Sequence, residues 1–156
     1  MTRILLLQGA NMEWLGLREP HLYGSTTAAE LDAQMRSYAH ERQIELEIAY
    51  SNQEGAAIDL IYAHARAKNL DAIVLNPGGF SYSGYALRDC IKAVGIPVVE
   101  LHMTNHYQRD IHSVVASASA GVVMGFGIDT YFLALDAALR VVRKARSAAV
   151  PARPAA

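Results

Sequence analysis

The sequence is poor in features that would direct it to an oxidising compartment or a membrane. Its 156 residues include a single cysteine, Cys90, which cannot form an intrachain disulfide or supply several thiolates to a zinc site. No apolar run reaches the roughly 20 residues of a membrane-spanning helix, and the N-terminus lacks the regions of a signal peptide. We therefore expect a cytoplasmic protein with no membrane partner.

An excess of charge of either sign is also missing. The chain carries 14 basic and 15 acidic residues, well interspersed, for a formal net charge of -1. This distribution provides no basic surface for nucleic acid. Glycine-rich phosphate loops and the Gly-x-Ser-x-Gly elbow are absent as well, so neither a dinucleotide or flavin cofactor nor acyl transfer is supported. A small-molecule ligand is expected, with no cofactor.

What the sequence does have is apolar residues, at 52% of the chain. That content and the length favour one domain with one well-buried core, which we place at residues 1–146. The remaining stretch, 147–156, has little core-forming content, and we expect it to be disordered.

Short apolar runs alternate with amphipathic stretches along the chain. Runs of this length are typical of strands buried on both faces of a parallel sheet. Strands are expected at 3–8, 44–50, 71–75, 97–101 and 120–124, and helices at 27–42, 54–68, 83–94 and 130–144. Thr27 and Glu30 match a capping box, Asn52 is a candidate cap of the second helix, and Ser81 or Ser83 of the third. The pattern predicts an α/β fold, a flavodoxin-like doubly wound five-stranded parallel sheet in three α/β/α layers.

The connection between the first strand and the first helix, residues 9–24, is unusually long. Such connections normally have about 2–6 residues, and structureless ones beyond about 12 are usually functional or disordered. This one contains Trp14, Leu15 and Leu22, which a solvated linker would not need. We interpret it as a lid over an active site.

Three polar clusters follow expected strands, at 9–24, 76–83 and 100–105. Ligands of doubly wound sheets bind at the carboxyl ends of the strands, so these clusters should meet. The residue types available there are Arg18, Tyr23, Asn76 and His102, which suit proton chemistry. A phenol acts as a general base only with a cation beside it, and a guanidinium about 4 Å away contributes up to about 4 kcal/mol at an effective dielectric of about 20.

Each of these residues also has a structural interpretation. On spacing alone, Tyr23 packing on the sheet beside a solvated Arg18 is the favoured interpretation, and His102 is either a general acid or a hydrogen-bonded core histidine. A metal site made of His102, His106 and His112 is a further alternative, although the three do not share a helical face.

Several motifs together resemble the type II 3-dehydroquinate dehydratases. The resemblance extends in order over about residues 3–144 and is carried by Asn76-Pro-Gly-Gly79, Glu100-Leu-His-Met-Thr-Asn105 and the stretches 11–27, 51–55, 86–89 and 121–127. It implies a flavodoxin-like fold assembled as trimers into a dodecamer. It also implies a metal-free anti-elimination of water from 3-dehydroquinate to 3-dehydroshikimate through an enolate, in shikimate or quinate metabolism.

The resemblance also implies roles for individual residues. Tyr23 would be the base that removes the proton alpha to the ketone, and Arg18 would stabilise its ionised form. His102 would protonate the leaving hydroxyl, with Glu100 setting its tautomer. Asn76 would hold the water that stabilises the enolate.

The remaining implied residues concern the substrate. The backbone at Met103 and Thr104 would take the carboxylate, and Asp89 would reach in from a neighbouring subunit to orient Arg18. Asn11 is a further expected substrate contact.

Three departures from the family pattern affect this site. Glu13 stands where the family has an amide and is expected to compete for Arg18. Tyr82 stands where the family has a substrate-binding histidine. The 105–113 loop is shortened, so the family's second arginine is either absent or replaced by Arg109.

These departures leave two alternatives to an active 3-dehydroquinate dehydratase. One is a divergent paralogue with the same proton-transfer residues and a modified cyclic substrate. The other is a catalytically silent binding or regulatory paralogue.

Overall fold

The computed structural model describes residues 1–149. Five strands form one sheet: β1 (Thr2–Ala10), β2 (Ile44–Tyr50), β3 (Ala72–Gly78), β4 (Val98–His102) and β5 (Gly121–Met124). Their order is β2-β1-β3-β4-β5, and every neighbouring pair is parallel. This is the flavodoxin-like arrangement, with its switch point between β1 and β3, and it confirms the predicted fold class.

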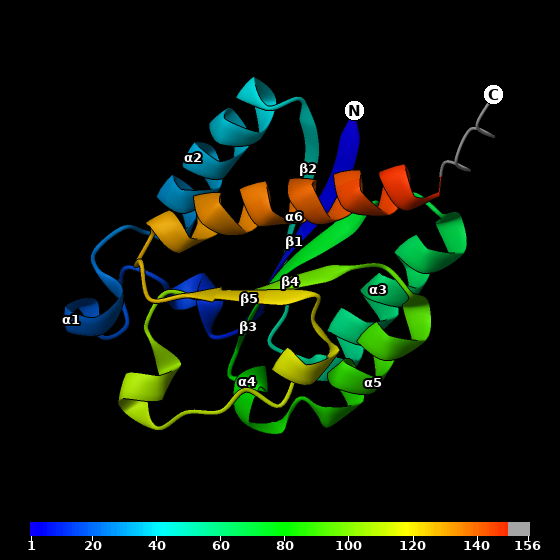
Figure 1. Cartoon of the computed structure of the whole chain (residues 1–156). Helices are drawn as coiled ribbons and strands as arrows, with labels where there is room; N and C mark the ends of the chain where they lie inside the picture. The colour runs from blue at the N-terminus through cyan, green and yellow to red at the C-terminus, as the bar shows by residue number, and fades with distance from the viewer. Residues whose placement is uncertain (150–156) are drawn as a thin grey trace, which may run out of the picture.

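Helices cover both faces of the sheet, as Figure 1 shows. One face carries α2 (Ala28–Glu41) and α6 (Asp129–Ala148), and the other carries α3 (Glu54–Ala67) and α5 (Tyr85–Val94). The alternation along β1 explains why both faces are apolar: Ile4 and Leu6 pack under α2 and α6, and Leu5 and Leu7 pack under α3 and α5. All four side chains are fully buried.

Short helical turns occupy the loops at the carboxyl edge of the sheet. They are η1 (Met12–Trp14), α1 (Pro20–Tyr23), α4 (Phe80–Ser83) and η2 (His106–Arg109). A further short helix, η3 (Ala116–Ala118), precedes β5 and contacts α5. The segment 105–119 thus contains two short helices. None of the helices within residues 1–149 is both long enough and apolar enough to cross a membrane.

The helix caps were predicted with mixed success. The capping box is confirmed, since Thr27 Oγ1 accepts the Glu30 N–H at 3.2 Å and Glu30 Oε2 accepts the Thr27 N–H at 2.8 Å. Asn52 does not cap α3, whose N-cap is Gln53, and its Oδ1 accepts the N–H of Asn11 instead. The predicted Ser81 or Ser83 cap of α5 is also wrong, because both lie in α4 and Gly84 is the N-cap.

At the C-terminus, α6 continues to Ala148, beyond the expected end at residue 144. The start of the stretch 147–156, predicted to be disordered, is therefore helical. The part of that prediction that concerns 150–156 lies outside the described residues.

We call residues 11–24, between β1 and α2, the lid segment. Its backbone takes left-handed conformations at Asn11 (φ 73), where the segment begins, and at Glu19 (φ 37), in its middle. Just before it, Gly9 lies so close to β3 that a Cβ there would overlap the carbonyl oxygen of Pro77. Because only glycine fits this approach, the lid segment leaves the sheet directly beside the end of β3.

Candidate active site

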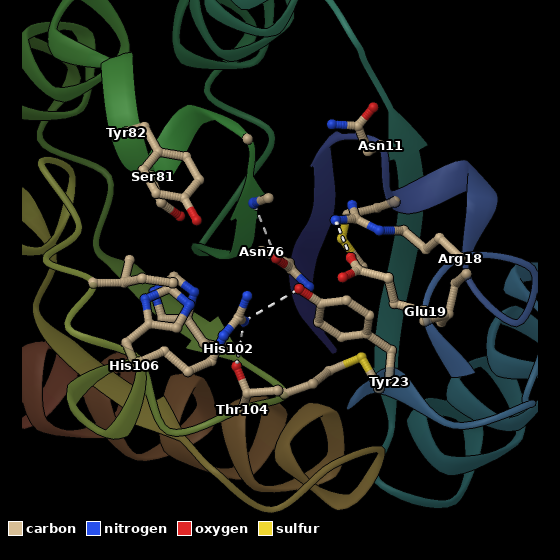
Figure 2. A pocket seen from close by; sticks show the side chains of 17 residues that line it. Asn11, Arg18, Glu19, Tyr23, Asn76, Ser81, Tyr82, His102, Thr104 and His106 are labelled. Carbon is tan, nitrogen blue, oxygen red and sulfur yellow. Dashed lines mark hydrogen bonds and ion pairs between the residues drawn. The ribbon is translucent and has the colours of Figure 1, made fainter. Parts of the chain in front are cut away.

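A cavity of about 230 Å³ lies at the carboxyl ends of β1, β3 and β4, beside the switch point of the sheet. The lid segment forms one wall and the 105–113 loop forms another. Figure 2 shows polar side chains entering it from both walls. The volume lies just below the range of about 300–1,000 Å³ that is common for small-molecule sites.

Tyr23 enters this cavity from the lid wall, at the end of α1. The Arg18 guanidinium carbon lies 4.9 Å from the centre of its ring. Arg18 also pairs with Glu19 at 3.5 Å, and both of these side chains are partly exposed. The lid wall therefore combines a phenol with a cation and a carboxylate.

A second cation reaches Tyr23 from the other wall. Arg109, at the end of η2, donates from Nη1 to the Tyr23 hydroxyl at 3.2 Å and to Thr104 Oγ1 at 3.0 Å. These bonds are the dashed lines at the centre of Figure 2. A guanidinium at hydrogen-bond distance stabilises a phenolate by charge and by donation, which is the environment that a tyrosine base needs.

The floor of the cavity is made of buried groups at the strand ends. Asn76, at 4% exposure, donates from Nδ2 to the Tyr131 hydroxyl at 2.8 Å, and its Oδ1 accepts the Gly78 N–H at 3.1 Å. The amide is thus fixed at both of its ends, with one N–H left for a molecule in the cavity.

His102 lies at the end of β4, in contact with a buried carboxylate. Its Nε2 lies 2.6 Å from Glu100 Oε1, and both residues are almost completely buried. Glu100 Oε2 accepts the Ser119 hydroxyl at 3.3 Å. Because Nε2 faces the carboxylate, Nδ1 is the ring nitrogen that remains for a molecule in the cavity. A histidine oriented in this way is suited to donate a proton.

His106 stacks on His102, with 3.7 Å between the ring centres. Burial, followed by the charges of His102 and Arg109, lowers the pKa of His106 to about 4. Its Nδ1 is buried with no hydrogen-bond partner among residues 1–149. The His106 ring is therefore neutral near pH 7.

The structure brings together most of the residues predicted from the sequence. Those that line the cavity are Asn11, Arg18, Tyr23, Asn76, Tyr82, His102, Met103, Thr104 and Arg109. Glu100 lies behind His102, as expected. Asp89 is not part of the cavity of this chain; it lies on α5, where its carboxylate accepts from Arg88 at 3.1 Å.

Two hypotheses from the sequence are wrong for this chain. Glu13 does not compete for Arg18, because it forms no ion pair within residues 1–149 and the carboxylate beside Arg18 is Glu19. The three-histidine metal site is also not formed: no group of metal-ligating side chains gathers among the described residues, and the rings of His102 and His106 stack on each other.

Sequence reasoning missed several functional neighbours. Glu19, Ser81 and His106 line the cavity, and Gln8 and Tyr131 lie directly beneath it. Gln8 carried a usable signal, since an amide inside an otherwise apolar strand needs a buried partner. Tyr131 gave none, because it falls on the apolar stripe of α6.

Known proteins resemble this chain over nearly its whole length. The family described as "Dehydroquinase class II" matches residues 2–139. The 3-dehydroquinate dehydratase of Anoxybacillus flavithermus is 45% identical over 146 residues, covering 91% of this chain and 97% of that one. That of Pelotomaculum thermopropionicum is 42% identical over 139 residues, covering 87% and 95%.

A solved structure of the same family is also similar to this chain. The type II dehydroquinase of Butyrivibrio crossotus superimposes with a TM-score of 0.84 at 34% identity, covering 88% of this chain and 97% of that one. The similarity therefore extends through the sheet and the cavity walls together.

Proposed function

The chain belongs to the class II dehydroquinase family, and we propose that it is a 3-dehydroquinate dehydratase, a hydro-lyase that converts 3-dehydroquinate to 3-dehydroshikimate. The observation that carries the proposal is the placement of Tyr23, with a guanidinium on its hydroxyl, in the same cavity as the His102–Glu100 pair. This cavity holds a base and an acid on different walls, as an elimination of water requires.

In the first step, Tyr23 removes the proton alpha to the ketone. Arg109 donates to its hydroxyl and Arg18 lies beside its ring, so two cations favour the phenolate. Electrons from the broken C–H bond move onto the ketone oxygen and give an enolate.

The free N–H of Asn76 stabilises the enolate that this step forms. It faces the cavity as a donor and stabilises the enolate oxygen, directly or through a water molecule. The enolate then collapses, and the C–O bond of the leaving hydroxyl breaks.

His102 supplies the proton that turns this hydroxyl into water. Glu100 holds Nε2 and so orients the ring, and the proton leaves from Nδ1. The backbone at Met103 and Thr104 and the side chains of Asn11 and Tyr82 are positioned to bind the substrate.

The wider setting is part of the same proposal. We infer a cytoplasmic enzyme of shikimate or quinate metabolism that works as a dodecamer of trimers. Asp89 is exposed on α5, which leaves it available to reach Arg18 of a neighbouring subunit.

A continuous ultraviolet assay tests this function. Purified protein mixed with 3-dehydroquinate should show rising absorbance as the conjugated enone forms, with no added metal or cofactor. An absence of turnover at high enzyme concentration would contradict the proposal.

One observation favours a second candidate, a paralogue that acts on a modified cyclic substrate. Tyr82 lines the cavity at 63% exposure, and Arg109 is already engaged by Tyr23 and Thr104, so two groups expected at the substrate hydroxyls differ from the family pattern. The same assay with ring-substituted analogues separates the two: a kcat/KM for an analogue above that for 3-dehydroquinate favours the second candidate.

A further inference from the structure

Beneath the cavity floor, three buried side chains from three elements form a hydrogen-bonded chain. Gln8 of β1 and Tyr131 of α6 are fully buried, and Asn76 of β3 is nearly so. The Tyr131 hydroxyl donates to Gln8 Oε1 at 3.0 Å and accepts from Asn76 Nδ2 at 2.8 Å. Neither Gln8 nor Tyr131 lines the cavity.

The direction of this chain follows from counting hydrogens. A tyrosine hydroxyl has one proton, and Tyr131 donates it in a hydrogen bond to Gln8 Oε1. Toward Asn76, the hydroxyl oxygen therefore acts only as an acceptor. The Gly78 N–H requires an acceptor at the other end of the amide. Both constraints place Asn76 Nδ2 on the Tyr131 side and rule out the flipped amide.

This direction matters for charge at the floor. In the observed orientation, Asn76 offers an N–H to the cavity, which suits an oxygen that gains negative charge. A flipped amide would bring its carbonyl oxygen toward the same charge. Burial raises the pKa of Tyr131 to about 12, so the hydroxyl keeps its proton for Gln8 over the whole working range.

We propose that Tyr131 and Gln8 are positioning residues that fix Asn76 as a hydrogen-bond donor toward the reacting oxygen. The proposal rests on the proposed function for its catalytic consequence. Its structural part, the fixed direction of the amide, does not depend on which substrate the cavity binds.

Two variants interrupt the chain at different points. Tyr131→Phe removes the acceptor of the Asn76 N–H. Gln8→Met keeps a similar side-chain length but frees the Tyr131 proton to donate elsewhere. Tyr38→Phe is the matched control, because it also removes a hydrogen-bonded hydroxyl, which donates to Asp136 at 3.0 Å, but Tyr38 does not line the cavity.

A double-mutant cycle with Asn76→Ala tests whether Tyr131 acts through Asn76. We expect Tyr131→Phe to lower kcat about tenfold or more with little change in KM, and Gln8→Met to lower it less. In the Asn76→Ala background, Tyr131→Phe should have no further effect on kcat. Equal losses in both backgrounds, or a loss as large for Tyr38→Phe, would overturn the proposal.

Crystal structures of the variants separate failure of this proposal from failure of the proposed function. If the wild-type protein does not turn over 3-dehydroquinate, the function is contradicted, and the orientation of Asn76 decides the inference. A displaced or rotated Asn76 side chain in Tyr131→Phe, and an unchanged one in Tyr38→Phe, would support it. An Asn76 that keeps its position in Tyr131→Phe would overturn it.

Discussion

The two sides of the cavity are built in different ways. The lid segment holds Arg18 and Tyr23 with one ion pair at 3.5 Å, a ring contact and a hydrogen bond from Arg109, and none of the residues of α1 is buried. The floor holds Asn76 and His102 with buried hydrogen bonds of 2.6–3.1 Å to neighbours that are themselves fixed. Figure 2 shows Tyr23 and His102 on opposite sides of the cavity.

This difference indicates that the lid segment and the floor of the cavity have different roles. Groups that must point in one direction, the amide donor and the imidazole, belong to the rigid sheet. The base belongs to a segment with few buried contacts, which can move to admit substrate and then close over it. Changes to the lid should therefore affect turnover more than stability, and changes to the floor should affect both.

Tyr23→Phe gives the largest expected effect and tests the lid side. Loss of the base should lower kcat by about 10²–10⁴-fold. The free energy of unfolding should change by less than about 0.5 kcal/mol, because the side chain is only partly buried. Steady-state kinetics and urea unfolding measure the two quantities.

The control is Tyr107→Phe, which removes a hydroxyl from a side chain that is 71% exposed. It should leave both quantities unchanged. A Tyr23→Phe enzyme with near wild-type kcat would refute the base assignment.

Glu100→Gln tests the floor side. It removes the charge that holds His102 Nε2 at 2.6 Å, and a charge-assisted hydrogen bond is worth about 1.5–3 kcal/mol. We expect kcat to fall about tenfold to a hundredfold, and the free energy of unfolding to fall by about 1–3 kcal/mol.

Glu47→Gln on β2 is the matched control, since that carboxylate lies 3.4 Å from a histidine, His64, and is half exposed. It should leave kcat unchanged. If Glu100→Gln loses activity but keeps its stability, the claim that changes to the floor lower both turnover and stability is contradicted.

The pH dependence of stability tests the packing of the floor. The pKa of His106 is about 4 in the folded protein, below the ordinary histidine value of 6.5, so the unfolded chain binds this proton more readily. Stability that is present above pH 6.5 is lost as the pH falls toward 4. Between pH 7 and pH 5 this one group should contribute a loss of about 2 kcal/mol.

Urea unfolding of the wild type and His106→Asn at both pH values measures this difference. The variant should lose about 2 kcal/mol less stability than the wild type on acidification. His21→Asn, on the exposed lid helix α1, should behave as the wild type. An identical pH dependence in all three proteins would contradict the floor geometry.

The smallest expected effect concerns the two carboxylates of the lid segment. Glu19 pairs with Arg18, but exposed ion pairs contribute only about 0–1 kcal/mol, so Glu19→Gln should change kcat/KM by no more than about fivefold. Glu13→Asn should change it less. A larger effect of Glu13→Asn would show that Glu13, and not Glu19, is the carboxylate that controls Arg18.

The sequence predicted the sheet well because buried parallel strands are continuous apolar runs. The strand ends at Asn76 and His102 followed from the same pattern, since polar residues begin where burial of apolar side chains ends. The capping box was equally local. These features depend on neighbours a few positions apart.

The contacts between distant segments could not be predicted in this way. Arg109 and Tyr23 are 86 positions apart, and Tyr131 and Gln8 are 123 apart. Glu19 reaches Arg18 only because its own backbone is left-handed, a conformation that sequence rarely signals for glutamate. Knowledge of the fold brings these residues together, and side-chain packing decides which atoms meet.

The most direct test of the division between lid and floor is the stereochemistry of proton removal. A base on the lid and an acid at the floor should take the proton and the hydroxyl from opposite faces of the ring. The measurement uses 3-dehydroquinate with deuterium at the methylene position anti to the leaving hydroxyl, and mass spectrometry of the product. Loss of the label, with a slower rate than for unlabelled substrate, is the predicted result; retention of the label would show syn elimination and contradict the account.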